Sequence, residues 1–256
     1  MTTADSNRPL SGKVALVTGA SHHIGGTIAA GMADAGAHAV LASKDGAGLS
    51  DLVAAITSAG GTASAMSVDM GNEDSVRALL VQIRDRFGRL DAVVNYVGAG
   101  RRAPTPLAEW ASEEFDIAIS EDLRGVFLCM KYEIELMRSG GTGGAIVNMC
   151  SPVGEQGFPG MSGNVASDFG VTGLTRAAAY DYASEGIRVN AISREPASIP
   201  GEIADGAVWL CSDQSLCLTG TILTVGRSSH PTQAERATKR GPSLLLRHRR
   251  IPGNIS

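Results

Sequence analysis

The chain has 256 residues, of which 43% are hydrophobic and 19% are charged, so it can form one large α/β domain with an ordinary globular core. Its formal net charge of −4 does not favour nucleic acid as a partner. Its first residues are polar and it contains no apolar stretch of bilayer length, so we expect a cytoplasmic protein without a signal peptide or a membrane segment.

Short apolar segments alternate with longer amphipathic segments along the chain. The apolar segments predict strands over residues 13–18, 38–42, 62–68, 91–95, 145–150, 187–192 and 222–225. The amphipathic segments predict helices over residues 24–35, 49–59, 73–87, 113–137, 163–183 and 203–210. Continuously apolar strands indicate burial on both faces, and the alternation of strand and helix indicates parallel pairing. The pattern therefore predicts an open, doubly wound α/β sheet that binds ligands at the carboxyl ends of its strands.

Two local features of composition bear on partners. From Ser229 onward the chain carries six Lys and Arg residues but a single Glu, a net charge of +5, which leaves about −9 on the rest. We interpret residues 229–256 as a basic, disordered and solvated tail. None of the four cysteines has the spacing of a zinc site, so we expect no metal centre and reduced thiols.

A glycine-rich turn follows the first predicted strand and opens the first predicted helix. It reads TGASHHIGG over residues 18–26. A turn of this kind aims backbone N–H groups and a helix N-terminus at a phosphate. The candidate cofactor-binding residues of this turn are Thr18, Gly19, Ser21, Ile24 and Gly25.

This turn and the segment before it, SGKVALVTGAS, resemble the opening of the short-chain dehydrogenase/reductase family, whose loop reads TGxxxGxG. The resemblance runs over about residues 10–225 and implies one Rossmann-like domain over residues 1–228. Gly19 and Gly25 match the first and last glycines of the loop, but His23 occupies the middle position. A side chain there can crowd a dinucleotide. This histidine and the one before it are therefore open to two interpretations, contact with phosphate or substrate, or drift in a site that is no longer constrained.

Further positions resemble the cofactor-binding residues of the family. Ser43 and Lys44 follow the second predicted strand, where an acid would bind the adenosine ribose of NAD. They suit a 2′-phosphate instead, so NADP(H) is the expected cofactor if a dinucleotide binds. Asp69 and Met70 resemble the adenine-contacting region, and Asn95 opens a segment, NYVG, that resembles the family's NNAG element. In the family, residues at these positions support the fold as much as they bind the cofactor.

The catalytic serine, tyrosine, lysine and asparagine of the family align with Ser151, Asn164, Asp168 and Asp122, so only the serine is retained. The flanking residues keep the family pattern, and a shift of the alignment does not restore the Tyr-x-x-x-Lys pair. Asparagine cannot donate a titratable proton, and a carboxylate in place of lysine raises the pKa of a nearby acid. We therefore expect conventional carbonyl-reductase activity to be close to background.

The resemblance also implies a truncated substrate lid. In the family, the sixth strand is followed by a Pro-Gly element and a threonine that hold the nicotinamide carboxamide, and then by a long mobile lid. Here Ile192 is followed by Ser193, Arg194 and Glu195, and residues 201–205 already resemble the next framework helix. An open and wet pocket is expected, which weakens electrostatic catalysis.

Three functions are compatible with this sequence. The one that we favour is a non-redox isomerase, dehydratase or cyclase, in which Asp122 and Asp168 act as an acid/base pair beside Ser151 on a carbonyl-containing small molecule. The second is an inactive relative that serves as a partner subunit. The third is an NADP(H)-dependent oxidoreductase with an unusual proton donor. The helices over 113–137 and 163–183 match the family's dimer interface, so a homo-oligomer or hetero-oligomer through them is expected.

Overall fold

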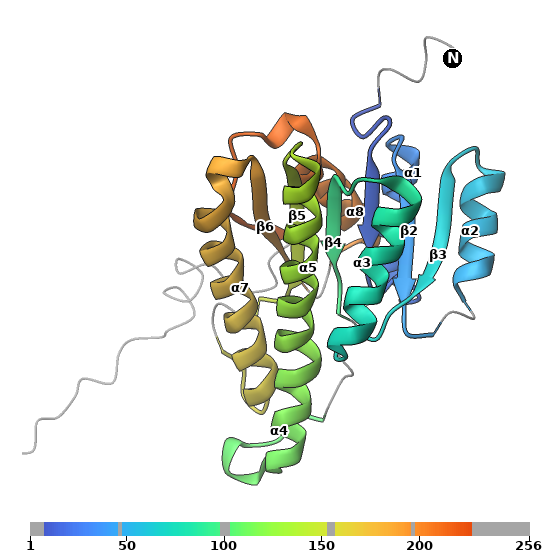
Figure 1. The fold of residues 1–256 in the computed structure, drawn as a ribbon. Helices are drawn as coiled ribbons and strands as arrows, with labels where there is room; N and C mark the ends of the chain where they lie inside the picture. The colour runs from blue at the N-terminus through green and yellow to red at the C-terminus, as the bar shows by residue number, and fades with distance from the viewer. Residues whose placement is uncertain (1–7, 46–47, 98–102, 153–156, 196–197, 227–256) are drawn as a thin grey trace, which may run out of the picture.

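A parallel sheet of seven strands forms the centre of the computed structural model, which describes residues 8–45, 48–97, 103–152, 157–195 and 198–226 (Figure 1). The strand order is β3-β2-β1-β4-β5-β6-β7, and every neighbouring pair is parallel. This confirms the predicted Rossmann-like, doubly wound sheet. The expected tail over 229–256 and the final glycine of the NYVG segment, Gly98, lie outside the described residues.

The elements follow the predicted order with small differences at their ends. The strands are β1 (Val14–Val17), β2 (His38–Ser43), β3 (Thr62–Ser67), β4 (Ala92–Asn95), β5 (Gly144–Cys150), β6 (Ile187–Arg194) and β7 (Ile222–Val225). The α-helices are α1 (His23–Asp34), α2 (Leu49–Ser58), α3 (Glu73–Phe87), α4 (Ser112–Ala118), α5 (Gly125–Gly140), α7 (Ser162–Tyr182) and α8 (Pro200–Cys211).

Helices cover both faces of the sheet and create two hydrophobic cores. Helices α3, α5 and α7 pack on one face, where their side chains meet those of the central strands (Figure 1). Helices α1, α2 and α8 pack on the other face and form the second core. The central strands β1 and β4 are buried throughout because they contribute to both cores. Strand β3 differs from the prediction of continuous burial, since this edge strand exposes alternate side chains.

Local capping explains why α3 has the predicted bounds. The side chain of Asn72 accepts a hydrogen bond from the backbone N–H of Ser75 at 3.1 Å, which satisfies a free donor of the first turn. At the other end Gly88 adopts the left-handed conformation with φ of 70° and stops the helix. Such residue-specific signals are visible in a sequence, so both ends of α3 could be predicted.

The helix predicted over 113–137 is interrupted. A π-helical segment, Ile119–Arg124, lies between α4 and α5, and it packs against α7. A π-helical turn contains about one residue more than an α-helical turn, which the hydrophobic period of the sequence does not reveal. The expectation of one regular helix was therefore wrong. The interruption places Asp122 within the irregular segment, and such segments are frequent at functional sites.

Candidate functional site

The candidate site lies where the strand order reverses, between β1 and β4. Ligands of doubly wound sheets bind at the carboxyl ends of the strands beside such a point. Thr18 follows β1 and Tyr96 follows β4, and the N–H of Tyr96 donates to Oγ1 of Thr18 at 3.0 Å. This hydrogen bond ties together the two strand ends that flank the crevice. Thr18 is fully buried, and the N–H of Tyr96 is the hydrogen-bond partner of its hydroxyl.

The two retained glycines of the turn after β1 are required by close backbone packing. Gly19 has a φ of 61°, and a Cβ added there would collide with the carbonyl oxygen of Tyr96. A Cβ added at Gly25 would collide with the carbonyl oxygen of Gly19. The turn is therefore as tight as a phosphate-binding turn, in which only glycine leaves room for the backbone.

The histidine at the middle glycine position fits this turn without backbone strain. His23 is the first residue of α1, its side chain is exposed, and no described residue other than glycine has a positive φ. The N-cap side chain, His22, makes no capping hydrogen bond. N–H groups of the first turn of α1 are thus not capped by this side chain and can bind an anion. Ser21 beside them is exposed, while Ile24 is partly buried against the second core.

Polar pairs lie at the carboxyl ends of β2 and β3. The hydroxyls of Ser21 and Ser43 are 2.5 Å apart. Nζ of Lys44 lies 2.7 Å from Oδ2 of Asp69. The hydrogen bond with Lys44 lowers the pKa of Asp69, and the same contact raises the pKa of Lys44. Together with the tight turn and the uncapped helix N-terminus, these hydroxyl and charged groups fit a dinucleotide that lies across the strand ends.

The aligned catalytic positions contain one direct contact. Ser151 follows β5 and Asp168 lies on α7, and Oγ of Ser151 donates to Oδ2 of Asp168 at 2.6 Å. Burial raises the pKa of Asp168 to about 6, although hydrogen bonds from the hydroxyl and backbone of Ser151 act in the opposite direction. A carboxyl group with this pKa can both accept and release a proton near neutral pH.

The other two aligned positions lie on neighbouring elements. Asn164 is partly buried one helical turn before Asp168 on the same side of α7. Asp122 is partly buried in the π-helical segment that packs against α7. The structure thus joins Ser151 to Asp168 directly and places Asn164 and Asp122 on the elements around this pair.

A buried polar network beneath the site was not predicted. Nδ2 of Asn95 donates to Oε2 of Glu133 at 2.9 Å and to Oδ1 of Asn148 at 3.1 Å, and Asn148 donates to Oγ1 of Thr175 at 3.0 Å. Glu133 is fully buried, and burial raises its pKa to about 8. Asn95 therefore serves the core below the crevice. Met70 is structural in a similar way, since its backbone and Cβ lie close to the first residue of α5.

Two further polar residues near the site were named in the sequence without a role. Ser193 ends the buried part of β6 and Glu195 follows this strand, and both side chains are buried. Residues 195–199 connect β6 to α8, so this connection is as short as the sequence implies. The available signal was the polar segment of Ser193, Arg194 and Glu195 where the family has its Pro-Gly element.

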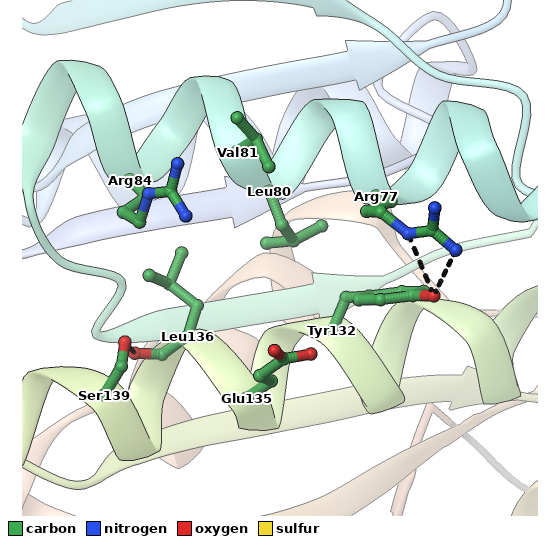
Figure 2. A pocket seen from close by; sticks show the side chains of 8 residues that line it. All are labelled: Arg77, Leu80, Val81, Arg84, Tyr132, Glu135, Leu136 and Ser139. Carbon is green, nitrogen blue, oxygen red and sulfur yellow. Dashed lines mark hydrogen bonds between the residues drawn. The ribbon is translucent and has the colours of Figure 1, made fainter.

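A separate groove of the described surface lies away from these residues. It has a volume of about 380 Å³ and runs between α3 and α5 on the outer side of the helices (Figure 2). Its floor is apolar, and at one end Arg77 donates two hydrogen bonds to the hydroxyl of Tyr132. None of the aligned catalytic residues lines this groove.

Comparison with known proteins gives consistent results. A family model described as short chain dehydrogenase matches residues 13–201. The chain is 39% identical over 180 residues to a 3beta-hydroxysteroid dehydrogenase of Mediterraneibacter gnavus, a match that covers 70% of this chain and 64% of that protein. It is 36% identical over 243 residues to a 2,5-dichloro-2,5-cyclohexadiene-1,4-diol dehydrogenase of Sphingobium indicum, covering 84% of this chain and 95% of that one. A short chain dehydrogenase structure from Mycobacterium smegmatis matches with a TM-score of 0.82 and 30% identity, over 88% and 95% of the two chains.

These relatives overturn the favoured expectation of a non-redox isomerase, dehydratase or cyclase. They are dehydrogenases that match this chain over most of its length, and they lend no support to an inactive partner subunit either. The expectation gave too much weight to the side chains of three aligned positions and too little to the retained framework.

The described helices also include none that is long and apolar enough to cross a membrane.

Proposed function

The chain belongs to the short-chain dehydrogenase family, and from this premise we propose that it is an NAD(P)(H)-dependent oxidoreductase that exchanges the substrate proton at the Ser151–Asp168 pair. The observation that carries the proposal is the 2.6 Å hydrogen bond between the hydroxyl of Ser151 and the carboxyl group of Asp168. That carboxyl group has its pKa raised by burial to about 6. A titratable group in contact with the family's serine offers an alternative to the usual tyrosine.

The chemistry divides between cofactor and protein. A bound nicotinamide accepts or donates the hydride, and the protein must handle the hydroxyl proton of the alcohol. On oxidation, Oγ of Ser151 accepts the hydrogen bond of the substrate hydroxyl while it donates its own proton to Asp168. The substrate proton passes to the serine oxygen, the serine proton passes to the carboxylate, and reduction reverses both transfers. A pKa near the working pH favours this exchange in both directions.

Asn164 and Asp122 have supporting roles in this proposal. Asn164 lies one turn from Asp168 on α7 and carries an amide that can orient a substrate oxygen without titrating. Asp122 belongs to the π-helical segment that packs against α7, so it is a positioning residue for the helix that carries Asp168.

NADP(H) is the cofactor that the end of β2 favours. Ser43 ends this strand and Lys44 follows it directly, and the exposed Lys44 and the hydroxyl of Ser43 are groups that a 2′-phosphate can use. Lys44 already pairs with Asp69, so a 2′-phosphate has to compete with a carboxylate for the ammonium group. This competition predicts a moderate preference for NADP(H) over NAD(H).

A small molecule with a hydroxyl or keto group on an apolar ring is the proposed substrate class. The relatives named above act on a hydroxysteroid and on a cyclohexadienediol. In this chain apolar side chains meet at the start of α7, next to Asn164: the ring of Trp110 packs against Gly163, and Pro104 packs against Gly160. Such surroundings favour an apolar ring over a charged substrate.

We also propose that α5 and α7 form an interface between subunits. Both helices expose aromatic side chains, with Phe127 of α5 and Phe169 of α7 each 48% exposed and Tyr180 of α7 86% exposed. Exposed aromatic residues on two neighbouring helices favour association with a second subunit. Whether that subunit is a second copy or a homologue can be determined from the mass of the complex in solution.

The test of the proposed activity is cofactor-dependent oxidation of a ring alcohol. The purified chain is incubated with NADP+ or NAD+ and an alcohol that carries deuterium on its hydroxyl-bearing carbon. We expect deuterium in the reduced cofactor, and we expect Ser151→Ala to abolish the transfer while dinucleotide binding persists. Failure of both dinucleotides to bind, measured by calorimetry, contradicts the proposal.

A further inference from the structure

An acidic segment with exposed apolar side chains lies between β4 and α5. Residues 107–121 contain five Asp and Glu residues and no Lys or Arg. In the same segment Leu107 is 73% exposed, Phe115 37% and Ile117 46%. Exposed apolar side chains that are surrounded by polar residues are typical of interaction sites. We refer to residues 107–121 as the acidic surface.

The carboxylates of the acidic surface have few counter-charges in the described part of the chain. Glu113 and Asp116 are exposed on α4, and neither forms an ion pair with a described residue. Other acids at the molecular surface are paired, as in the 2.8 Å contact between Oε1 of Glu73 and Nζ of Lys131. The acidic surface therefore keeps a negative potential that a positively charged partner can neutralise.

The acidic surface and the end of the described chain lie at the same edge of the sheet. Helix α4 packs against α7 and projects beyond the start of that helix at the carboxyl edge (Figure 1). Gly226 is exposed and directly follows β7, which pairs parallel to β6 and so ends at the carboxyl edge as well. The chain beyond Gly226 therefore starts on the side of the molecule that carries the acidic surface.

The residues after Gly226 have the length and the chemistry to bind there. Residues 244–250 read LLLRHRR, so three leucines adjoin a segment with three arginines. The chain between Gly226 and Leu244 can span about 60 Å when extended, whereas a domain of this size has a radius of gyration of about 18 Å. Arginine pairs with carboxylates, and leucine gains free energy when it covers exposed apolar side chains.

We propose that residues 244–250 bind the acidic surface of the same chain. The arginines lie beside Glu113 and Asp116, and the leucines cover the apolar side chains around them. This inference goes beyond the proposed function and does not depend on cofactor binding. Because both partners belong to one chain, their effective concentration is roughly millimolar, so contacts that are weak individually suffice.

Binding of residues 244–250 has a consequence for the wall of the candidate site. The ring of Trp110 packs against Gly163 at the start of α7, and its Nε1 donates to the carbonyl oxygen of Thr105 at 2.7 Å. A segment bound to the exposed side chains of the acidic surface therefore restrains this wall against α7. The restraint should weaken with salt, since the screening length falls from about 10 Å at 0.1 M to about 3 Å at 1 M.

The test measures contact within the full chain. A nitroxide spin label is attached to Ser243→Cys, in a chain whose exposed native cysteine is removed by Cys217→Ser. We expect the label to broaden the amide NMR signals of residues 107–121 at about 0.1 M salt, and much less at about 1 M. Absence of broadening at the lower salt concentration overturns the inference. Broadening that also occurs in isotope-enriched chains without a label, mixed with labelled chains, shows contact between copies and overturns it too.

A charge exchange tests the pairing itself. Arg247→Glu, Arg249→Glu and Arg250→Glu together should abolish the broadening without changing any described residue. Glu113→Lys with Asp116→Lys should abolish it as well, and all five substitutions combined should restore it because the charges are then exchanged. Broadening that survives either reversal, or that the combination fails to restore, contradicts the proposed contact.

The matched control reverses two exposed acids on the opposite face of the sheet. Asp51→Lys on α2 with Asp205→Lys on α8 changes the net charge as much as the pair on α4. Asp51 lies in the first turn of its helix, as Glu113 does, so the two pairs of substitutions perturb a helix N-terminus alike. The control variant should keep the broadening. If it loses the broadening to the same extent, the contact depends on net charge alone, and the inference is overturned.

Discussion

The amino edge of the sheet, where the parallel strands begin, and the carboxyl edge, where they end, differ in how their buried polar and charged groups are paired. At the amino edge, below β1, β4 and β6, the charged groups are matched. Nη2 of Arg89 lies 2.5 Å from Oδ1 of Asp91, whose other oxygen accepts from the backbone N–H of Val14 at 2.8 Å. Arg188 is buried, and its guanidinium donates to the carbonyl oxygens of Leu210, Ser212 and Ser215 at distances of 2.8 to 3.2 Å.

At the carboxyl edge the buried polar groups are incompletely matched. The four buried side-chain atoms without a partner among the described residues belong to Asn95, Glu133, Ser193 and Glu195, which lie at the strand ends or directly beneath them. Asp168 in the same region has a raised pKa. The difference indicates that the amino edge is arranged for stability, whereas the carboxyl edge keeps unfavourable groups that a ligand or a proton transfer can use.

The largest expected effect is at Asp168. Asp168→Asn removes the titratable group but keeps the shape and an acceptor for Ser151, so turnover should fall by about 10²–10⁴-fold. Above about pH 6 the variant should be more stable than the wild type. In the wild type the unfolded carboxyl group ionises above its ordinary pKa of 3.8 and the folded one only above about 6, so the wild type loses stability between these pH values. Turnover assays and urea unfolding at pH 8 check both parts. A variant with full activity, or with lower stability at pH 8, contradicts the contrast between the edges.

At the amino edge we expect a substitution to lower stability and to leave turnover unchanged. Arg188→Met removes the donors that satisfy the carbonyl groups at the end of α8, and leaving such groups unpaired costs roughly 3 kcal/mol or more in the free energy of unfolding. The turnover of the folded fraction should not change, since Arg188 lies at the opposite end of the strands. Urea unfolding and activity at low temperature measure the two quantities. Lost turnover at unchanged stability would reverse the assignment of the edges.

An effect of intermediate size on stability is expected at Glu133. Burial raises the pKa of this carboxyl group to about 8, so the folded chain holds a proton that the unfolded chain releases above pH 4.5. Stability should therefore fall as the pH rises from 4.5 to about 8. Glu133→Gln avoids this loss and should be more stable by roughly 3 kcal/mol at pH 7, with no gain near pH 4.5. The exposed neighbour on α5 provides the control, since Glu135→Gln makes the same substitution at a carboxyl group that is not buried.

The smallest expected effect concerns cofactor choice. Lys44 is 79% exposed and pairs with Asp69, so its contribution to phosphate binding is screened by solvent. Lys44→Ala should weaken NADP+ several-fold and leave NAD+ unchanged in the same calorimetric titration. Lys131→Ala removes another exposed lysine that pairs with an acid, Glu73, and should change neither affinity. Equal weakening of both cofactors by Lys44→Ala argues against a 2′-phosphate contact.

The sequence predicted the elements better than the environments of individual side chains. The bounds of α3 and β7 match the prediction, because capping residues and a short apolar run are local signals. The π-helical segment was missed, because one added residue leaves the hydrophobic pattern nearly unchanged. The burial of Glu133 within an apolar helix face and the unpartnered oxygen of Glu195 depend on packing between distant segments. Alignment placed Asp168 near Ser151, but the hydrogen bond and the raised pKa required the structure.

The central claim is that Asp168 exchanges the substrate proton through Ser151. The most direct test is the pH dependence of kcat/KM for alcohol oxidation, which reports the essential groups of the free enzyme. Because oxidation requires the carboxylate form, kcat/KM should rise with pH through an apparent pKa of about 6 and then level off. Asp168→Asn should be slow and should lack this rise. A wild-type profile that is flat between pH 5 and 8, or the same rise in Asp168→Asn, contradicts the account.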